Sequence, residues 1–110
     1  MGFLYKDKEY VTDSEGYLQD INLWNDDVMH YMASLDNLEL TDRHILVIKL
    51  VRKYYEEYAT TPPIRSLITY LKQQGYSDIA NSIALAKLFP LGAAKSASKY
   101  AGLKKPVKCI

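Results

Sequence analysis

The sequence predicts a mostly α-helical fold of the α+β class: a compact bundle of about five helices, with a small N-terminal β-hairpin or meander and a flexible C-terminal arm. The hydrophobic period changes from two residues to about 3.6 after the N-terminal segment. Capping residues and Pro/Gly breakers then divide the chain into about five helical segments. Pro106 and its neighbours cannot continue a helix. We therefore expect one helical domain over residues 1–101, with its β element at about 1–21, and an arm over residues 102–110.

The N-terminal segment consists of short apolar runs separated by turn residues. The runs FLY, EYVT and YLQDI are interrupted by the polar stretches KDK and DSEG. Two turn signals between aromatic and β-branched runs are typical of a hairpin or of a three-stranded meander.

The first two predicted helices carry broad apolar faces. The first begins between residues 22 and 25 and ends at Leu35, and the second follows Thr41, a suitable N-cap, and ends near Tyr58. On the first, the apolar face comprises Trp24, Val28, Tyr31, Met32 and Leu35. On the second it comprises Ile45, Ile48, Val51, Tyr55 and Tyr58, widened by Val47, Leu50 and Tyr54. The breadth of this second face predicts that its helix is the most buried one.

Three further helices are expected in the C-terminal half. In TTPPIRSLITYLKQQG, Thr61 can cap the helix, Pro62 suits its first turn and Gly75 can end it. Its core-facing residues are Ile64, Leu67, Ile68 and Leu71. A shorter helix over residues 77–88 is broken by a proline and a glycine, and a last helix over residues 93–101 stops at Gly102.

Composition and charge narrow the classes of function. The chain of 110 residues can form one modest core, and its 48% hydrophobic and 25% charged residues are ordinary for a soluble domain. The net charge is only +1, but residues 87–110 carry six lysines and no acid, whereas residues 1–86 carry 8 Lys/Arg and 13 Asp/Glu. The C-terminal end is thus a cationic pole that favours anionic partners. With no secretory signal and no apolar run long enough for a membrane span, we expect a cytoplasmic protein with no membrane partner.

Most catalytic signatures are missing from the sequence. It contains no GxxxxGK[ST], GxGxxG or HExxH motif. Its single cysteine can form neither an internal disulfide nor a zinc cage, and we expect no cofactor and no metal. His30 and His44 stand alone, and each is expected to be a surface or half-buried histidine.

Arg65 is the one cation whose position is hard to explain by structure alone. It follows TPP in the first turn of a predicted helix, where a positive charge opposes the helix dipole. It either faces an anion or a partner, or is a surface arginine with a packed stem. Two helices joined by ATTPP also allow a helix-turn-helix regulator, but the second helix offers only Arg65 and Lys72 for phosphates.

Cys109, the next-to-last residue, is a thiol that cannot join a core. A lone cysteine near a terminus is a chance event in most proteins, but the arm could carry its sulfur roughly 23–25 Å into a partner's pocket. A unit charge at about 7 Å in water contributes only about 0.6 kcal/mol, and the terminal carboxylate offsets the lysines. The lysines are therefore better explained as docking contacts than as activators of the thiol.

The ending AGLKKPVKCI resembles the C-terminal arm of the DsrC/TusE sulfur-carrier family, which finishes in a Gly-Leu-x-Lys-Pro-x-x-Cys pattern with one residue after the cysteine. Three further segments resemble the family, so that the likeness extends over essentially the whole chain: DSEGYLQDINLWN, LELTDRHILVIKLVRKYYEEYATTPPIRSLITYLK and LFPLGAAKSASKYAGL. The family fold is mostly helical with a small N-terminal β element.

The resemblance implies a sulfurtransferase that carries a persulfide on Cys109, with little stand-alone catalysis. Two-cysteine members have a second cysteine eleven residues earlier, where this chain has Ser98, so the single-cysteine TusE-like branch is favoured. There, sulfur passes from a TusBCD-like donor complex to an MnmA-like tRNA thiouridylase for 2-thiouridine at the wobble position, with indirect or weak tRNA contact. The expected partner-binding residues are Lys104, Lys105, Lys108, Arg65 and Lys95. The alternatives are a helix-turn-helix DNA-binding regulator, a DsrC-like partner in sulfur oxidation, and a subunit that docks by its tail without chemistry.

Overall fold

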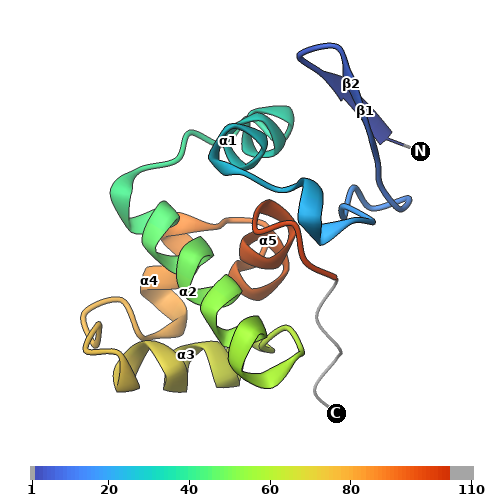
Figure 1. Cartoon of the computed structure of the whole chain (residues 1–110). Helices are drawn as coiled ribbons and strands as arrows, with labels where there is room; N and C mark the ends of the chain where they lie inside the picture. Colours follow the sequence, from blue (N-terminus) through green and yellow to red (C-terminus); the bar gives the residue numbers. More distant parts are fainter. Residues whose placement is uncertain (1, 105–110) are drawn as a thin grey trace.

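The computed structural model describes residues 2–104. In chain order it contains β1 (Gly2–Tyr5), β2 (Lys8–Val11), the 3₁₀ helix η1 (Ile21–Leu23), α1 (Asp26–Leu35), α2 (Asp42–Tyr58), α3 (Ile64–Gln73), α4 (Ser82–Leu88) and α5 (Ala93–Tyr100). Five α-helices surround one core, and the two strands form a hairpin that stands beside α1, away from α3 and α4 (Figure 1). This confirms the predicted fold class.

The hairpin is held to the body by aromatic rings. Its strands pair antiparallel, with Phe3 opposite Tyr10. The ring centroids of Phe3 and Tyr31 lie 5.3 Å apart and those of Tyr5 and Tyr31 lie 4.6 Å apart, which ties β1 to α1. A third strand does not form within the described residues: YLQDI contributes a single bridge, between Thr12 and Leu18.

The first two helices begin at side-chain caps. Asn25 caps α1 by accepting a hydrogen bond of 2.9 Å from the Val28 backbone N–H. Thr41 caps α2 as predicted, in a capping box whose second member is His44. The α1 prediction was wrong at two positions of the apolar face. Trp24 lies before the helix, at the C-cap of η1, and Leu35 is 54% exposed.

Two predicted helix starts were wrong. Thr61 does not cap α3, which begins at Ile64 with Pro63 at its N-cap, because a residue that precedes a proline is driven into extended conformation. The fourth helix begins at Ser82 instead of residue 77, because Asn81 supplies a better cap, accepting a hydrogen bond of 2.8 Å from the Ala84 backbone N–H. At the other end, α5 stops at Tyr100, one residue short of the expected end.

The most enclosed helix is α5, and not α2 as the sequence predicted. Contacts from α5 reach α1, α2, α3 and α4, and Figure 1 shows it in the middle of the bundle. Five of its eight residues are buried, compared with five of the seventeen in α2, where Tyr58 is 55% exposed. The small side chains of AAKSASKY allow this close approach, since Ala and Ser let neighbouring helices come near the backbone.

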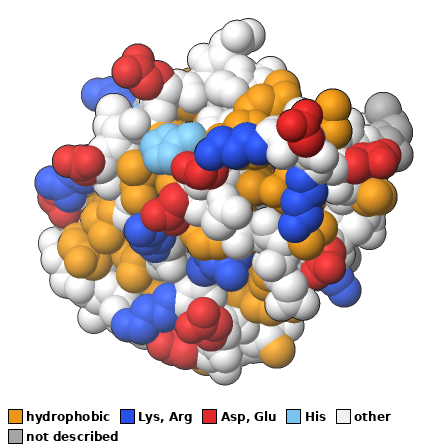
Figure 2. Space-filling model, turned by 45° about the horizontal axis from the view of Figure 1, so that its top comes forward, with side chains coloured by type: hydrophobic (Ala, Val, Ile, Leu, Met, Phe, Trp, Pro, Cys, Tyr) orange, Lys and Arg blue, Asp and Glu red, His pale blue; other side chains and the backbone are white. Residues whose placement is uncertain are grey.

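The core is continuous across the bundle. Its largest fully buried side chains are Val28, Met29, Met32, Val47, Ile48, Val51, Leu67, Leu71, Leu85, Phe89, Tyr100 and Leu103. On the face shown in Figure 2, Lys and Arg side chains are interspersed with Asp and Glu, with apolar side chains between them. Within residues 2–104, no helix is both long enough and apolar enough to cross a bilayer.

Candidate functional site at the root of the C-terminal arm

The structure describes the place from which the predicted arm starts, and not the thiol itself. Cys109, Lys105 and Lys108 lie outside the described residues. Lys104 is the last described residue and is exposed. We call residues 100–104 the arm root, and it is here that the body can influence where the thiol goes.

The arm root begins as a well-formed helix end. The Gly102 N–H donates to the Lys99 carbonyl (3.1 Å), and the Leu103 N–H donates to the Ser98 carbonyl (3.0 Å). Gly102 has a φ of +72°, in the left-handed region that favours glycine. These two bonds and this glycine form a Schellman motif, which ends α5 and turns the chain away from the helix axis.

Two side chains from other elements bind the remaining carbonyls of this helix end. The Trp24 indole Nε1–H donates to the Tyr100 carbonyl and the Arg52 guanidinium Nη1–H donates to the Ala101 carbonyl, both at 2.6 Å. The Arg52 guanidinium also lies over the Trp24 ring, 4.0 Å from its centroid. A cation is favourable at the negative end of a helix, and α5 receives one from α2.

Arg52 remains charged in this position. It is half-buried, and burial lowers the pKa of its guanidinium from the ordinary range, while Glu56 partly offsets the effect. Since the pKa of arginine is ordinarily so high, the side chain keeps its proton at any physiological pH. The hydrogen bond to Ala101 is therefore charge-assisted, which is the stronger kind.

The backbone stays against the body as far as Leu103. A Cβ added to Gly102 would lie 2.8 Å from Cδ1 and 2.9 Å from Cβ of Trp24, so no other residue fits there without displacing the indole. Leu103 is 2% exposed and belongs to the core. The sequence places the boundary between the helical body and the arm at residues 101 and 102. We propose instead that this boundary follows Leu103.

On its other side, the helix end is held by a carboxylate. The Tyr100 hydroxyl donates to Asp36 Oδ2 (2.8 Å), and Lys99 Nζ forms an ion pair of 2.9 Å with the same oxygen. Burial, and secondarily the Asp36 carboxylate, raise the pKa of the Tyr100 phenol far above its ordinary value. The ring of Tyr100 is thus fixed by Asp36 while its carbonyl is fixed by Trp24.

Ser98 lies on the same helix, eleven residues before Cys109. It is completely buried, and its Oγ has no hydrogen-bond partner within the described part of the chain. Burying a hydroxyl without a partner lowers the free energy of unfolding, so the surroundings of this position suit an apolar or weakly polar group.

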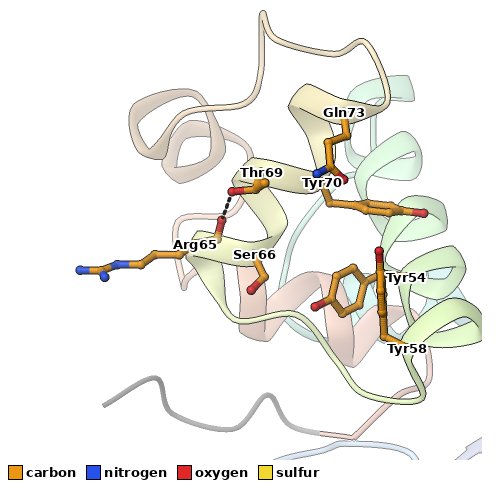
Figure 3. Close-up of a pocket in the computed structure, with 7 residues that line it drawn as sticks. All are labelled: Tyr54, Tyr58, Arg65, Ser66, Thr69, Tyr70 and Gln73. Carbon is orange, nitrogen blue, oxygen red and sulfur yellow. Dashed lines mark hydrogen bonds between the residues drawn. The ribbon is translucent and has the colours of Figure 1, made fainter.

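Arg65 lies elsewhere, at the edge of a shallow groove between α2 and α3. The groove has a volume of about 380 Å³ and is lined by Tyr54, Tyr58, Arg65, Ser66, Thr69, Tyr70 and Gln73. The tyrosine rings lie toward one another, with centroids 4.5 Å apart for Tyr54–Tyr58 and 5.3 Å for Tyr54–Tyr70, whereas the Arg65 side chain extends away from them (Figure 3). No acidic side chain of residues 2–104 forms a salt bridge with Arg65.

Lys95 is also exposed, in the first turn of α5. Its carbonyl accepts a hydrogen bond of 3.3 Å from the Tyr17 hydroxyl. The arm root is at the opposite end of this helix, about 9 Å away along the axis. Lys95, Arg65 and Lys104 therefore do not meet in one described site, although each is accessible to a partner.

The prediction for His44 was wrong: it is 6% exposed and structural. Its Nδ1 accepts a hydrogen bond of 3.0 Å from the Thr41 backbone N–H, and its Nε2 lies 2.6 Å from the Leu88 carbonyl, to which it donates in the matching tautomer. The ring thereby ties the start of α2 to the end of α4. His30 is exposed, as expected.

Sequence reasoning missed Trp24 and Arg52, the two side chains that hold the arm root. For Arg52 the sequence does offer a signal: this cation lies next to Val51 and close to Tyr54, which both belong to the predicted apolar face of its helix. Among residues 2–104, no three His, Cys, Asp or Glu side chains gather as metal ligands. The described site is an anchor, and the chemistry it could serve belongs to the residues that follow it.

Comparison with known proteins finds matches over nearly the full length of the chain. The DsrC like protein family matches residues 4–110. A protein named sulfurtransferase TusE homolog, from Haemophilus influenzae, is 46% identical over 102 residues, which are 93% of this chain and 94% of that protein.

Two solved structures are similar in sequence and in fold. The NMR structure of Allochromatium vinosum DsrC has a TM-score of 0.89 and 40% identity, covering 99% of this chain and 97% of that one. The crystal structure of the oxidized γ-subunit of dissimilatory sulfite reductase (DsrC) from Archaeoglobus fulgidus has a TM-score of 0.79 and 34% identity, covering 96% of each chain.

Proposed function

The chain belongs to the DsrC-like protein family and is a sulfurtransferase of a sulfur relay, and we propose that Cys109 is the residue that carries the sulfur. The observation that supports this most strongly is that the family match continues through residue 110, so the terminal cysteine falls within it. Cys109 is also the only thiol of the chain. The arm root, with its last described residue exposed, suits a group that must reach a partner.

The proposed chemistry is two thiol exchanges. The Cys109 thiolate attacks the outer sulfur of a donor persulfide, the donor's S–S bond breaks, and the donor cysteine leaves as a thiolate. Cys109 then holds the sulfane sulfur as a persulfide. In the second step an acceptor thiolate attacks that outer sulfur and Cys109 leaves as the thiolate, so no outside oxidant or reductant is needed.

The proposed route runs through tRNA modification in the cytoplasm. We infer a TusBCD-like donor complex and an MnmA-like tRNA thiouridylase as acceptor, so that the sulfur ends in 2-thiouridine at the wobble position. The name of the Haemophilus influenzae relative supports this assignment. Ser98 supports it too, because a serine at that position cannot form a disulfide with Cys109.

The lysines of the arm are proposed as docking contacts. Lys104, Lys105 and Lys108 would meet acidic side chains of the protein partners, with Arg65 and Lys95 as further contacts and any tRNA contact weak or indirect. Exposure of Lys104, Arg65 and Lys95 supports the proposal.

A DsrC-like role in sulfur oxidation is the second candidate, because the similar solved structures are DsrC proteins. In that case Cys109 would still carry the sulfur, but the acceptor would be a different enzyme. The helix-turn-helix reading has no such support, since α3 carries only Arg65 and Lys72 as cations.

The route is tested by the 2-thiouridine content of tRNA in a strain that lacks this gene. We expect the wild-type gene to restore 2-thiouridine and Cys109→Ser to leave it absent. Restoration by Cys109→Ser would contradict the persulfide proposal. If neither the wild-type gene nor Cys109→Ser restores 2-thiouridine, but Cys109 of the wild type is charged with sulfur in the cell, then Cys109 is still the sulfur carrier and its acceptor is another enzyme.

A further inference from the structure

We propose that Trp24 and Arg52 are positioning residues for sulfur delivery: together they fix the point and the direction in which the Cys109 arm leaves the body. The inference rests on the proposed role of Cys109. It concerns two residues that lie 85 and 57 positions before that cysteine in the chain and whose side chains hydrogen-bond to the arm root.

The first argument is the complete hydrogen-bonding of the helix end. The last four carbonyls of a helix have no partner within it. In α5 the Ser98 and Lys99 carbonyls accept from the turn that follows, which leaves the last two open. The Tyr100 and Ala101 carbonyls are the two that Trp24 and Arg52 bind, so all four have partners and the peptide planes of the arm root are held in one orientation.

The second argument is that the two side chains hold each other. Arg52 covers the Trp24 ring at 4.0 Å, and Gly102 lies against the edge of the same indole. Trp24 directly follows η1 and Arg52 lies on α2, so the helix end is anchored to two separate parts of the chain. A single side-chain hydrogen bond would leave the turn free to rotate about that bond. Two donors that bind adjacent carbonyls prevent this rotation.

The third argument concerns reach. With the arm root held as far as Leu103, residues 104–109 can extend by about 20–22 Å at most. If the turn after α5 were released, residues 101–109 could extend by about 30–32 Å, and the volume open to the thiol would grow roughly threefold. The effective concentration of Cys109 at a docked partner would fall accordingly, and its approach would lose its direction.

The direction of the arm can be measured without a partner, because Cys109 is the only cysteine. A nitroxide attached to Cys109 broadens the amide resonances of nearby residues, and the pattern of broadening maps the region that the arm visits. The variants are Trp24→Phe, which keeps a ring and removes the indole N–H, and Arg52→Gln, which removes the cation. Lys53→Gln is the control, since it removes a neighbouring exposed charge that does not contact the arm root.

We expect the wild-type protein and Lys53→Gln to show broadening on one side of the body, and Trp24→Phe and Arg52→Gln to show it spread over a larger surface. Identical maps for all four proteins would overturn the inference. If Arg52→Gln does not fold, judged by its amide spectrum, then Arg52→Lys takes its place, and we expect a map between the wild type and Trp24→Phe.

The consequence for transfer is measured with persulfide-charged donor proteins. We expect Trp24→Phe and Arg52→Gln to slow transfer to Cys109 by about threefold to tenfold, since small misplacements of reacting groups are costly. The reaction of Cys109 with a small thiol reagent should be unchanged, which separates aiming from a general loss of structure. Equal transfer rates in wild type and variants would refute the inference, whereas a wild type that never accepts sulfur would refute the proposed function instead.

Discussion

At the scale of single residues, the buried hydroxyl of Ser98 leads to a prediction about the free energy of unfolding. Its Oγ is fully buried and lacks a partner among residues 2–104. Ser98→Ala removes the cost of desolvating that hydroxyl, and we expect the free energy of unfolding to rise by about 1–2 kcal/mol in urea titrations.

Ser96→Ala is the matched control on the same helix. Ser96 is also buried, but its hydroxyl interacts with the Tyr100 phenol and lowers the pKa of that group. This substitution should destabilise the protein, because it removes a favourable interaction of a buried hydroxyl, whereas Ser98→Ala removes a hydroxyl without a described partner. A loss of stability in Ser98→Ala would show that its hydroxyl has a partner in solution.

The raised pKa of Tyr17 predicts how the free energy of unfolding depends on pH in the alkaline range. Burial, with smaller effects of Glu15 and Asp13, raises the pKa of its phenol from 10.0 to about 12. Between these values the folded state binds more protons than the unfolded state, so the free energy of unfolding falls as pH rises from 10 to 12. The contribution is complete below pH 10 and is on the order of 2 kcal/mol.

The measurement is a set of urea titrations from pH 8 to pH 11.5 on wild type, Tyr17→Phe and the exposed-site control Tyr58→Phe. We expect a shallower decline above pH 10 only in Tyr17→Phe. Equal slopes in all three proteins would show that Tyr17 titrates in the folded state as it does in the unfolded chain.

Residue by residue, the sequence predicted what depends on local spacing and missed what depends on long-range contacts. Thr41 was identifiable as a cap because its partner is three residues away. Trp24 and Arg52 bind backbone groups 76 and 49 residues away, and His44 binds one 44 residues away. No periodicity encodes such pairs, so the sequence places Trp24 on a helix face, places His44 at or near the surface and does not single out Arg52.

At the scale of elements, the end of α5 is the feature on which the candidate site depends. Gly102→Ala combines a left-handed φ of +72° with a Cβ that would lie 2.8 Å from the Trp24 ring. We expect a loss of about 2–4 kcal/mol in the free energy of unfolding, from backbone strain and displacement of the indole. Because Trp24 is the only tryptophan, its fluorescence should shift as well.

Gly75→Ala separates the two causes. Gly75 has a φ of +90° but nothing within 4 Å of an added Cβ, so its substitution carries the strain without the collision. A smaller loss of stability and an unchanged emission spectrum are expected. If Gly75→Ala and Gly102→Ala cost the same and neither alters the fluorescence, the contact between Gly102 and Trp24 is not important.

Element boundaries follow the chemistry of the helix caps. The start of α2 after Thr41 was predicted, and so was its end near Tyr58. The starts of α3 and α4 lie later than the sequence predicts, because the residues at their N-caps are Pro63 and Asn81. The central place of α5 could not be seen from hydrophobic pattern, since its burial comes from small Ala and Ser side chains.

At the scale of the whole molecule, the separation of charge along the chain predicts the salt dependence of transfer. Residues 87–110 carry six lysines and no acid. The double variant Lys105→Gln/Lys108→Gln should slow sulfur transfer about twofold to tenfold at low salt and little at high salt, since exposed charges contribute about 0.2–1 kcal/mol each and are screened.

The charge-matched control is Lys53→Gln/Lys72→Gln, which changes two exposed lysines of α2 and α3 outside residues 87–110. It should transfer sulfur at the wild-type rate. If both double variants slow transfer equally, the effect reflects net charge and the arm lysines are not specific docking contacts.

The central claim is that Cys109 carries a sulfane sulfur, and the most direct test is the mass of the intact protein. Wild type and Cys109→Ser are incubated with a cysteine desulfurase, free cysteine and the upstream relay proteins. The account predicts a gain of one sulfur atom on the wild type, lost on reduction and absent from Cys109→Ser. Donor proteins that charge their own cysteines while the wild type stays at its original mass would contradict it.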